Sequence, residues 1–188
     1  MAPKMVYYPD PRLREESAPV GKEDLAKMRE AAPGMFEVMY RHRGIGLAGP
    51  QIGLLKRIVV ANIMGNVEHK DQEKVFLNPA IEKKSGTMNE FEGCLSLPGL
   101  SAQIRRSAQL KVTYYDLEGS MWEMDCEGLW AKLFQHEIDH LDGVLMIDKM
   151  SAADLKQFKP LLKELEEDFK AKRDPKRRRD REGGQPEL

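Results

Sequence analysis

The chain has 188 residues, of which 41% are apolar, and a formal net charge of −1. This length and composition predict a single domain with its own core, and the near-zero charge excludes a protein that binds nucleic acid over its whole surface. Neither a signal peptide nor an apolar run long enough to cross a membrane is evident, and two cysteines cannot form a disulfide framework. These features are typical of a cytoplasmic enzyme with a cysteine free for chemistry.

The first helix is expected over residues 23–41, where apolar side chains recur at helical spacing. Its methionine-rich face predicts core packing rather than a cofactor site. Pro33 and Gly34 interrupt the pattern. The sequence therefore predicts either one kinked helix or two short helices.

A glycine-rich segment follows at residues 44–53, with the sequence Gly-Ile-Gly-Leu-Ala-Gly-Pro-Gln-Ile-Gly. Glycine allows unusual backbone angles and the close approach of another molecule. The segment lacks the preceding strand of a dinucleotide-binding loop and the Gly-Lys-Ser/Thr ending of a P-loop. It predicts either a plain connection or a loop that lines a narrow cleft, with Gln51 directed into the cleft.

Four runs of β-branched and aromatic residues predict strands, at 57–63, 74–84, 110–116 and 120–126. Asn78-Pro79 should break the second run, which is expected to form one or two strands. The last two runs predict a hairpin, and Cys126 in its second strand is expected to pack in the core. The order of helix, strands and helices predicts a small α+β domain with a mainly antiparallel sheet.

Cys94 lies in the segment Glu-Gly-Cys-Leu-Ser, between turn-forming residues, and is expected at an exposed bend. Three interpretations are open: a small buried residue, a nucleophile or a metal ligand. A cysteine nucleophile needs a histidine base, and the two good candidates, His136 and His140, are better placed as ligands.

The motif Gln-His-Glu-Ile-Asp-His occupies residues 135–140, in a helix expected between Gly128 and Gly143. On a helix, His136 and His140 lie one turn apart on one face, so both rings can reach one metal ion. A glutamate beside the first histidine can move protons on a water at that metal.

Leu129 and Leu133 precede the two histidines on the same face, within an arc of about 60°. Trp130, Phe134 and Leu141 form a neighbouring apolar stripe, which predicts that the helix packs centrally against the core. Two histidines leave a zinc-type site incomplete, because it needs at least one further protein ligand.

A C-terminal helix is expected from Ser151, which pairs with Asp154 as a helix cap, and Pro160 should kink it or end its first part. Residues 170–188 form a basic segment that predicts a disordered tail. The tail is expected either to bind RNA electrostatically or to remain solvated without a partner.

Three stretches stand in the order G-I-G-L-A-G-P-Q, E-G-C-L-S and Q-H-E-I-D-H. Together they resemble the motifs of bacterial peptide deformylases, which remove the formyl group from the N-terminal formyl-methionine of new polypeptides and release formate. The resemblance covers about residues 5–169, so that residues 1–169 are expected to form the catalytic domain. One departure is Ala48-Gly49, where the family usually has two alanines.

The resemblance implies a metal site and two further groups of catalytic residues. The implied metal ligands are Cys94, His136 and His140. The implied general acid and base is Glu137, and the groups implied to stabilise the oxyanion are the Gln51 side chain and the backbone N–H of Leu95. Ligand chemistry alone favours zinc. The resemblance instead implies Fe²⁺ in the cell, with Zn²⁺, Ni²⁺ or Co²⁺ able to occupy the site.

The implied substrate is the formylated end of a nascent peptide. A narrow cleft lined by glycine, including Gly46, should exclude acyl groups larger than formyl by steric clash. The methionine side chain needs an apolar slot, for which the candidates are Ile45, Leu129 and Leu133. The basic tail is expected to place the enzyme near the ribosome, and no membrane contact is expected.

Two alternatives have different chemistry. An ordinary zinc metallopeptidase would take its third ligand downstream, from Asp142, Asp148 or Asp154, and would keep its metal when Cys94 is changed to serine. A ribosome- or RNA-associated protein with a structural metal would tolerate the loss of Glu137, because a structural site needs no proton shuttle.

Overall fold

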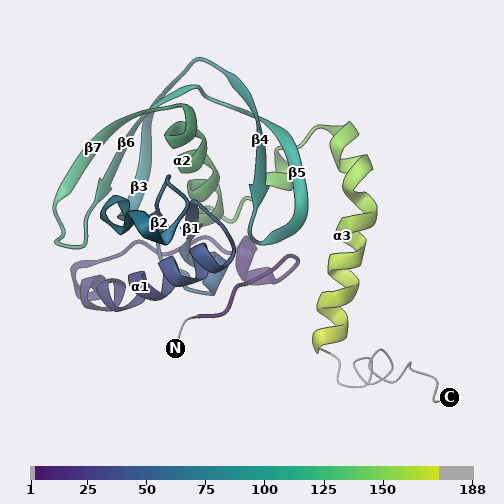
Figure 1. Cartoon of the computed structure of the whole chain (residues 1–188), viewed down its shortest axis with the longest axis horizontal. Helices are drawn as coiled ribbons and strands as arrows, with labels where there is room; N and C mark the ends of the chain where they lie inside the picture. The colour runs from purple at the N-terminus through teal and green to yellow at the C-terminus, as the bar shows by residue number, and fades with distance from the viewer. Residues whose placement is uncertain (1–2, 174–188) are drawn as a thin grey trace.

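The computed structural model describes residues 3–173 (Figure 1). Its helices and strands are α1 (Leu25–Arg41), β1 (Gly46–Ala48), β2 (Ile58–Ala61), β3 (Lys74–Ser85), β4 (Met88–Cys94), β5 (Leu97–Arg106), β6 (Gln109–Tyr115), β7 (Met121–Glu127), α2 (Gly128–Leu141) and α3 (Ala152–Arg173). No helix in this part of the chain is long and apolar enough to span a membrane.

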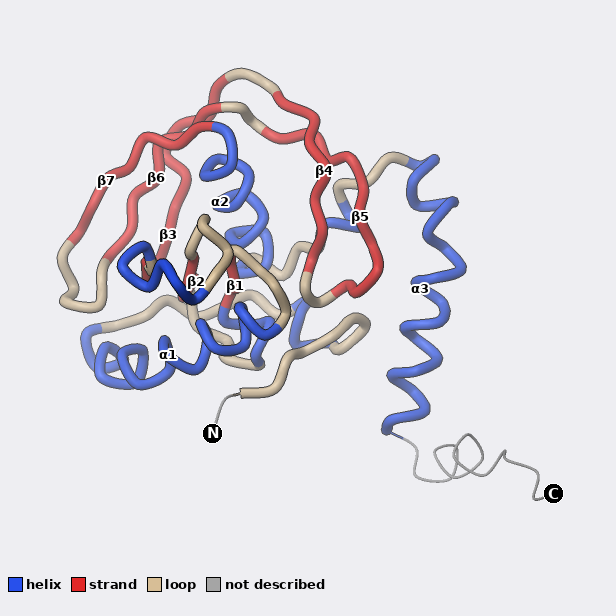
Figure 2. The backbone as a smooth tube through the Cα atoms, in the orientation of Figure 1, coloured by secondary structure: helices blue, strands red, loops and turns tan. Residues whose placement is uncertain are grey.

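The strands form two antiparallel sheets, which confirms the predicted α+β fold. Five strands pair in the order β1-β2-β3-β6-β7, and β4 pairs with β5 in a separate ribbon. Figure 2 shows α2 between the larger sheet and the β4–β5 ribbon, with α3 on the outer side of β5. The helix that carries the histidines is therefore central, as its apolar stripe predicted.

Aromatic packing fixes α2 against the larger sheet. Phe134 is fully buried, and its ring centroid lies 4.8 Å from that of Phe76 on β3. Trp130 packs on the same Phe76 ring at 5.9 Å. Burying a side chain of this size contributes about 1.5–3 kcal/mol, so these contacts hold the helix rigidly.

Polar contacts fasten α2 and the glycine-rich segment to their neighbours. Gln135 accepts a hydrogen bond from the Ser107 N–H at 2.9 Å and donates one to the Ser107 carbonyl at 3.0 Å. Near the N-terminus, Val6 N–H donates to the Gln51 carbonyl at 2.7 Å, and Tyr8 N–H donates to the Ser96 carbonyl at 2.9 Å. The N-terminal segment thereby joins the first and second motifs.

Two prolines lie inside continuous helices, which leaves the single helix of the two predicted alternatives for α1 and shows that Pro160 does not end the first part of α3. Pro33 is within α1 and Pro160 is within α3, and neither helix is divided. Both prolines are exposed, and each removes one helical hydrogen bond. In α1, Met28 and Met35 are fully buried in the core, and this packing offsets the local cost.

The strand predictions were correct in position but incomplete. The β6–β7 hairpin is confirmed, and β3 is one strand with a register shift between Leu77 and Ala80, where Asn78 has a φ of 49°. Strands β1, β4 and β5 were not predicted. Their short or glycine-containing sequences resemble loops, and they are extended because β1 pairs with β2 and β4 pairs with β5.

The C-terminal helix confirms the predicted cap, since Ser151 Oγ accepts a hydrogen bond from Asp154 N–H at 3.1 Å. α3 continues to Arg173, so the first four residues of the predicted tail are helical. The remainder of that tail, residues 174–188, lies outside the described residues.

Candidate metal centre

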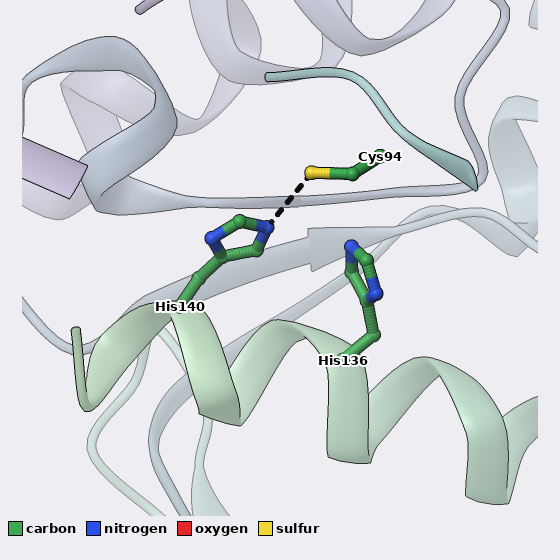
Figure 3. Close-up of side chains that lie close together, drawn as sticks. All are labelled: Cys94, His136 and His140. Atoms are coloured by element: carbon green, nitrogen blue, oxygen red, sulfur yellow. Dashed lines mark hydrogen bonds between the residues drawn. The ribbon is translucent and has the colours of Figure 1, made fainter. Parts of the chain in front are cut away.

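Helix α2 presents both histidines of the third motif to the same side. Figure 3 shows the rings of His136 and His140 directed toward Cys94. Their ring centroids are 5.0 Å apart, and His140 is only 1% exposed. The i and i+4 spacing on a rigid, buried helix therefore brings the two imidazoles to one point, as predicted.

Cys94 ends β4 and brings the third candidate ligand. Its Sγ lies 3.2 Å from Nε2 of His140 (Figure 3), and the ligand atoms of Cys94, His136 and His140 all lie within 4.8 Å of one another. The predicted exposed bend is wrong, because Cys94 is 7% exposed. The thiol contacts Gln51 and His140, both far away in the chain, and local sequence patterns do not reveal such contacts.

This donor set fits a divalent metal ion. One thiolate and two imidazoles are ligands of zinc-type and other borderline-soft metals, and three protein ligands leave a position for water or substrate. Oε2 of Glu137 is buried beside these ligands and has no hydrogen-bond partner within residues 3–173. A buried carboxylate oxygen without a protein partner is expected where water or substrate binds.

A buried network of charged side chains contacts the ring nitrogen of His136 that is not the candidate metal donor. Nδ1 of His136 lies 3.0 Å from Oε2 of Glu92. Arg106 donates to both carboxylate oxygens of Glu92, at 2.8 Å to Oε1 and 2.9 Å to Oε2. Arg106 also pairs with Asp139. A proton held on Nδ1 by Glu92 leaves Nε2 of His136 as the metal donor.

Ionised Glu92 is favoured in the folded protein. Burial raises the pKa of Glu92, but hydrogen bonds from Arg106 and His136 outweigh it and lower the pKa from 4.5 to about 2. A lowered pKa contributes stability above the unfolded value of 4.5, and this contribution is lost as pH falls toward 2. The Glu92 carboxylate is therefore ionised at neutral pH and pairs with the Arg106 cation.

Glu137 is the candidate proton carrier. It is 5% exposed, and burial raises its pKa to about 7, although the His136 charge acts in the opposite direction. A bound cation would lower this pKa. A carboxyl group that titrates near neutrality can accept a proton and return it during one turnover.

Gly46 explains why the first motif needs a glycine at this position. A Cβ atom on Gly46 would lie 2.8 Å from Oε1 of Glu137, which is closer than van der Waals contact. We expect Gly46→Ala to displace the Glu137 carboxylate and to reduce kcat by about 100-fold, measured by steady-state kinetics. Gly93→Ala is the matched comparison, because its Cβ would meet Leu100 at an ordinary 3.7 Å. Equal losses of kcat in the two variants would contradict this role.

Gln51 is buried and oriented by the first motif itself. The Ala48 N–H donates to Oε1 of Gln51 at 2.8 Å, which orients the amide NH₂ as the donor. That nitrogen donates to Ser96 Oγ at 3.3 Å and to Cys94 Sγ at 3.8 Å. The predicted direction of Gln51, into the cleft, agrees with this geometry, because Gln51 lines the cavity and lies beside the candidate ligand Cys94.

A cavity of about 680 Å³ is lined by Cys94, His136 and Glu137. Its lining includes every predicted substrate-binding residue, namely Ile45, Gly46, Leu129 and Leu133. Leu95, from the turn after β4, also lines the cavity. Leu133 is 4% exposed, whereas Leu129 is 40% exposed. Leu133 therefore lies deep in the cavity wall, and Leu129 lies near the opening.

The downstream aspartates of the metallopeptidase alternative bind elsewhere. Asp142 pairs with Arg57, Asp148 pairs with Arg14, and Asp154 bonds to Ser151. Within residues 3–173, the cluster of possible metal ligands consists of Cys94, His136 and His140. This arrangement disfavours an aspartate as third ligand.

Sequence reasoning missed the residues that support the ligands. Glu92 precedes Cys94 by two positions in a strand, and this period-2 spacing places both side chains on one face, so a signal was present. Arg106 and Ser96 carry no local signal, because their partners are distant in the chain.

Comparison with known proteins agrees with the geometry. The family model "Polypeptide deformylase" matches residues 2–156. Curated peptide deformylases are similar in sequence. The protein from Alkalilimnicola ehrlichii is 42% identical over 161 residues, which cover 86% of this chain and 89% of the relative. The one from Acidobacterium capsulatum is 45% identical, over 79% of this chain and 86% of the relative.

Solved structures extend the similarity to the fold. The Plasmodium falciparum peptide deformylase superposes with a TM-score of 0.83 at 39% identity, covering 89% of this chain and 98% of that one. The Thermus thermophilus enzyme gives 0.83 at 36% identity, over 89% and 99% of the two chains. With the three motifs, the shared fold and the clustered ligands, the chain belongs to the polypeptide deformylase family.

Proposed function

We propose that this protein removes the formyl group from the N-terminal formyl-methionine of nascent polypeptides and releases formate. The observation that carries the proposal is the buried Glu137 carboxylate beside a cysteine and two histidines, at the base of an open cavity. A family member with this arrangement is a metal-dependent hydrolase. Because its substrates are made on ribosomes, a cytoplasmic location follows from the proposal.

The side chains of the site have separate tasks in this reaction. When bound by Cys94, His136 and His140, a divalent metal supplies a Lewis acid and a more acidic water. Glu137 takes the proton of the attacking water and returns it to the departing amine. The Gln51 amide and the Leu95 N–H donate hydrogen bonds to the oxygen that becomes negative on the formyl carbon.

The direct test is formate release from formyl-Met-Ala-Ser by protein reconstituted with iron under anaerobic conditions. Turnover of this peptide, with no cleavage of the unformylated peptide bonds, is the expected result. Cleavage within an unformylated peptide, retained when Cys94 is replaced by serine, would instead support a metallopeptidase.

We propose Fe²⁺ as the metal in the cell, in line with the family resemblance, with Zn²⁺, Ni²⁺ or Co²⁺ also compatible with a Cys/His/His donor set. Elemental analysis of protein purified without air is expected to find about one iron per chain. One equivalent of zinc without iron, in protein from cells supplied with both metals, would overturn this choice.

Leu133 is proposed to line the slot for the methionine side chain. We expect Leu133→Ala to raise KM for formyl-Met-Ala-Ser by about tenfold, because the lost methyl groups no longer contact the substrate. Leu133 also packs in the core, so the change should lower stability. Leu141→Ala is the matched control, since Leu141 is fully buried on the same helix but does not line the cavity. A raised KM in both variants would contradict the assignment of Leu133 to the methionine slot.

We further propose that the basic C-terminal segment contacts the ribosome, on the basis of its Lys- and Arg-rich sequence. Ending the chain after Arg173 preserves α3, whose Phe158 and Leu162 pack on the core. The truncated protein is expected to lose co-sedimentation with ribosomes at low salt and to keep its turnover of formyl-Met-Ala-Ser. Unchanged co-sedimentation would rule out this contact.

A further inference from the structure

Arg43 occupies an unusual backbone position at the end of α1. Its φ is 58°, in the left-handed region, and its N–H donates to the Tyr40 carbonyl at 2.9 Å. The next N–H, from Gly44, donates to the Met39 carbonyl at 2.9 Å. This pair of bonds is a Schellman cap, in which the left-handed residue is usually glycine because a Cβ atom is strained there.

The strained arginine lies at the mouth of the substrate cavity. Arg43 lines the cavity and is exposed, and within residues 3–173 it forms no ion pair. Lys132 also lines the cavity and donates a hydrogen bond to the Phe91 carbonyl at 3.2 Å, and among the described residues it forms no ion pair. Uncompensated cations in a cleft attract anionic ligands.

The acidic residues of the cavity do not balance these cations. Its lining includes two carboxylates, Glu92 and Glu137, and both are buried. Glu92 is neutralised by Arg106, and Glu137 lies at the reacting centre. The outer part of the cavity is therefore positively charged.

We propose that Arg43 is a specificity-determining residue, which selects formyl-methionyl peptides carrying Asp or Glu within the three residues after methionine. This inference rests on the proposed deformylase function. Gly46 lies against Glu137 at the reacting centre. Arg43 precedes Gly46 by three residues, so the backbone of Arg43 lies at most about 11 Å from that of Gly46. An extended peptide advances about 3.3 Å per residue, so those three side chains come within reach of the guanidinium group.

The backbone strain supports a role in binding rather than in folding. Residues held in the left-handed region cluster at functional sites, where the surrounding structure maintains them. Glycine at this position would relieve the strain. An arginine that weakens the cap and lines the cavity without a partner in residues 3–173 is explained by a contact made with substrate.

The test compares formyl-Met-Ala-Ala-Ala with three peptides that carry Asp at the second, third or fourth position, and with the matching Lys peptides. We expect kcat/KM to favour at least one Asp peptide over its Lys counterpart by about fivefold at low salt. The ratio should fall toward one at about 0.5 M salt, because screening weakens exposed ion pairs. Equal kcat/KM for the Asp and Lys peptides at all three positions would overturn the proposal.

Two variants locate the preference on Arg43. Arg43→Gly is expected to bring the Asp-to-Lys ratio close to one and to raise Tm by about 2 °C. Arg43→Glu is expected to invert the ratio. The control is Arg41→Ala, at an exposed arginine that pairs with Glu37 and does not line the cavity, and it should keep the wild-type ratio.

The possible outcomes distinguish a failure of the proposed role of Arg43 from a failure of the proposed deformylase function. Normal turnover of formyl-Met-Ala-Ala-Ala with no charge preference, or a preference retained by Arg43→Gly, overturns the role of Arg43 alone. Absence of turnover for every formylated peptide overturns the deformylase function and this inference together.

Discussion

Replacing Glu137 by glutamine is expected to reduce kcat by about 1,000-fold while the bound metal is retained. Glutamine has the same shape but cannot accept and return a proton, and general acid–base groups contribute about 10²–10⁴ in rate. Glu137 is not among the three clustered ligands, so metal content by elemental analysis should be unchanged. The unfolding midpoint should also be maintained, because a buried carboxylate becomes a neutral amide.

Glu127→Gln is the matched control for this prediction. Glu127 immediately precedes α2, is exposed, and does not line the substrate cavity. Its kcat should equal that of the wild type. If Glu137→Gln kept kcat within tenfold of the wild type, the proton-carrying role would be lost, and a structural metal site would explain the cluster better.

Replacing Arg106 by methionine should produce the largest loss of stability. Arg106 is 6% exposed and pairs with Glu92 and Asp139. Its removal leaves Glu92 buried without its cation, which costs about 3–5 kcal/mol. The free energy of unfolding from urea titration measures this effect. Metal affinity should fall by about 10–100-fold, because Glu92 would no longer orient His136 firmly.

Arg105→Met tests whether position, rather than charge, decides the effect of the Arg106 change. Arg105 is the preceding residue of β5 and is exposed, so its loss should change the free energy of unfolding by less than about 0.5 kcal/mol. Similar losses from both substitutions would show that Glu92 does not depend on Arg106. Arg106→Lys should restore part of the stability, because it keeps the charge but not the double contact.

Several parts of the site could be predicted from local sequence. The spacing of His136 and His140 determines their common helical face, and Glu137 lies beside them by covalent connection. The hairpin of β6 and β7 follows from alternating residues around a turn. These features depend on neighbours within a few residues, for which sequence distance and spatial distance are nearly equivalent.

Other features depend on contacts between segments far apart in the chain. Cys94 reaches His140 across 46 positions, and the β4–β5 ribbon that carries it is linked to α2 by the pairs of Glu92 with His136 and of Arg106 with Asp139. Arg106 finds Glu92 and Asp139 on two other elements. Such pairings form only when long loops of the chain bring distant residues together, and no local sequence pattern predicts them.

Residue identities and helical spacing establish which side chains are available as candidate ligands, which one can carry a proton, and which helix presents two of them. Folding of the whole chain places the cysteine against the imidazoles, Gly46 against Glu137 and Arg43 at the cavity mouth. These two contributions differ because helical period fixes geometry between near neighbours, whereas a metal site and its cavity arise from core packing that brings distant segments together.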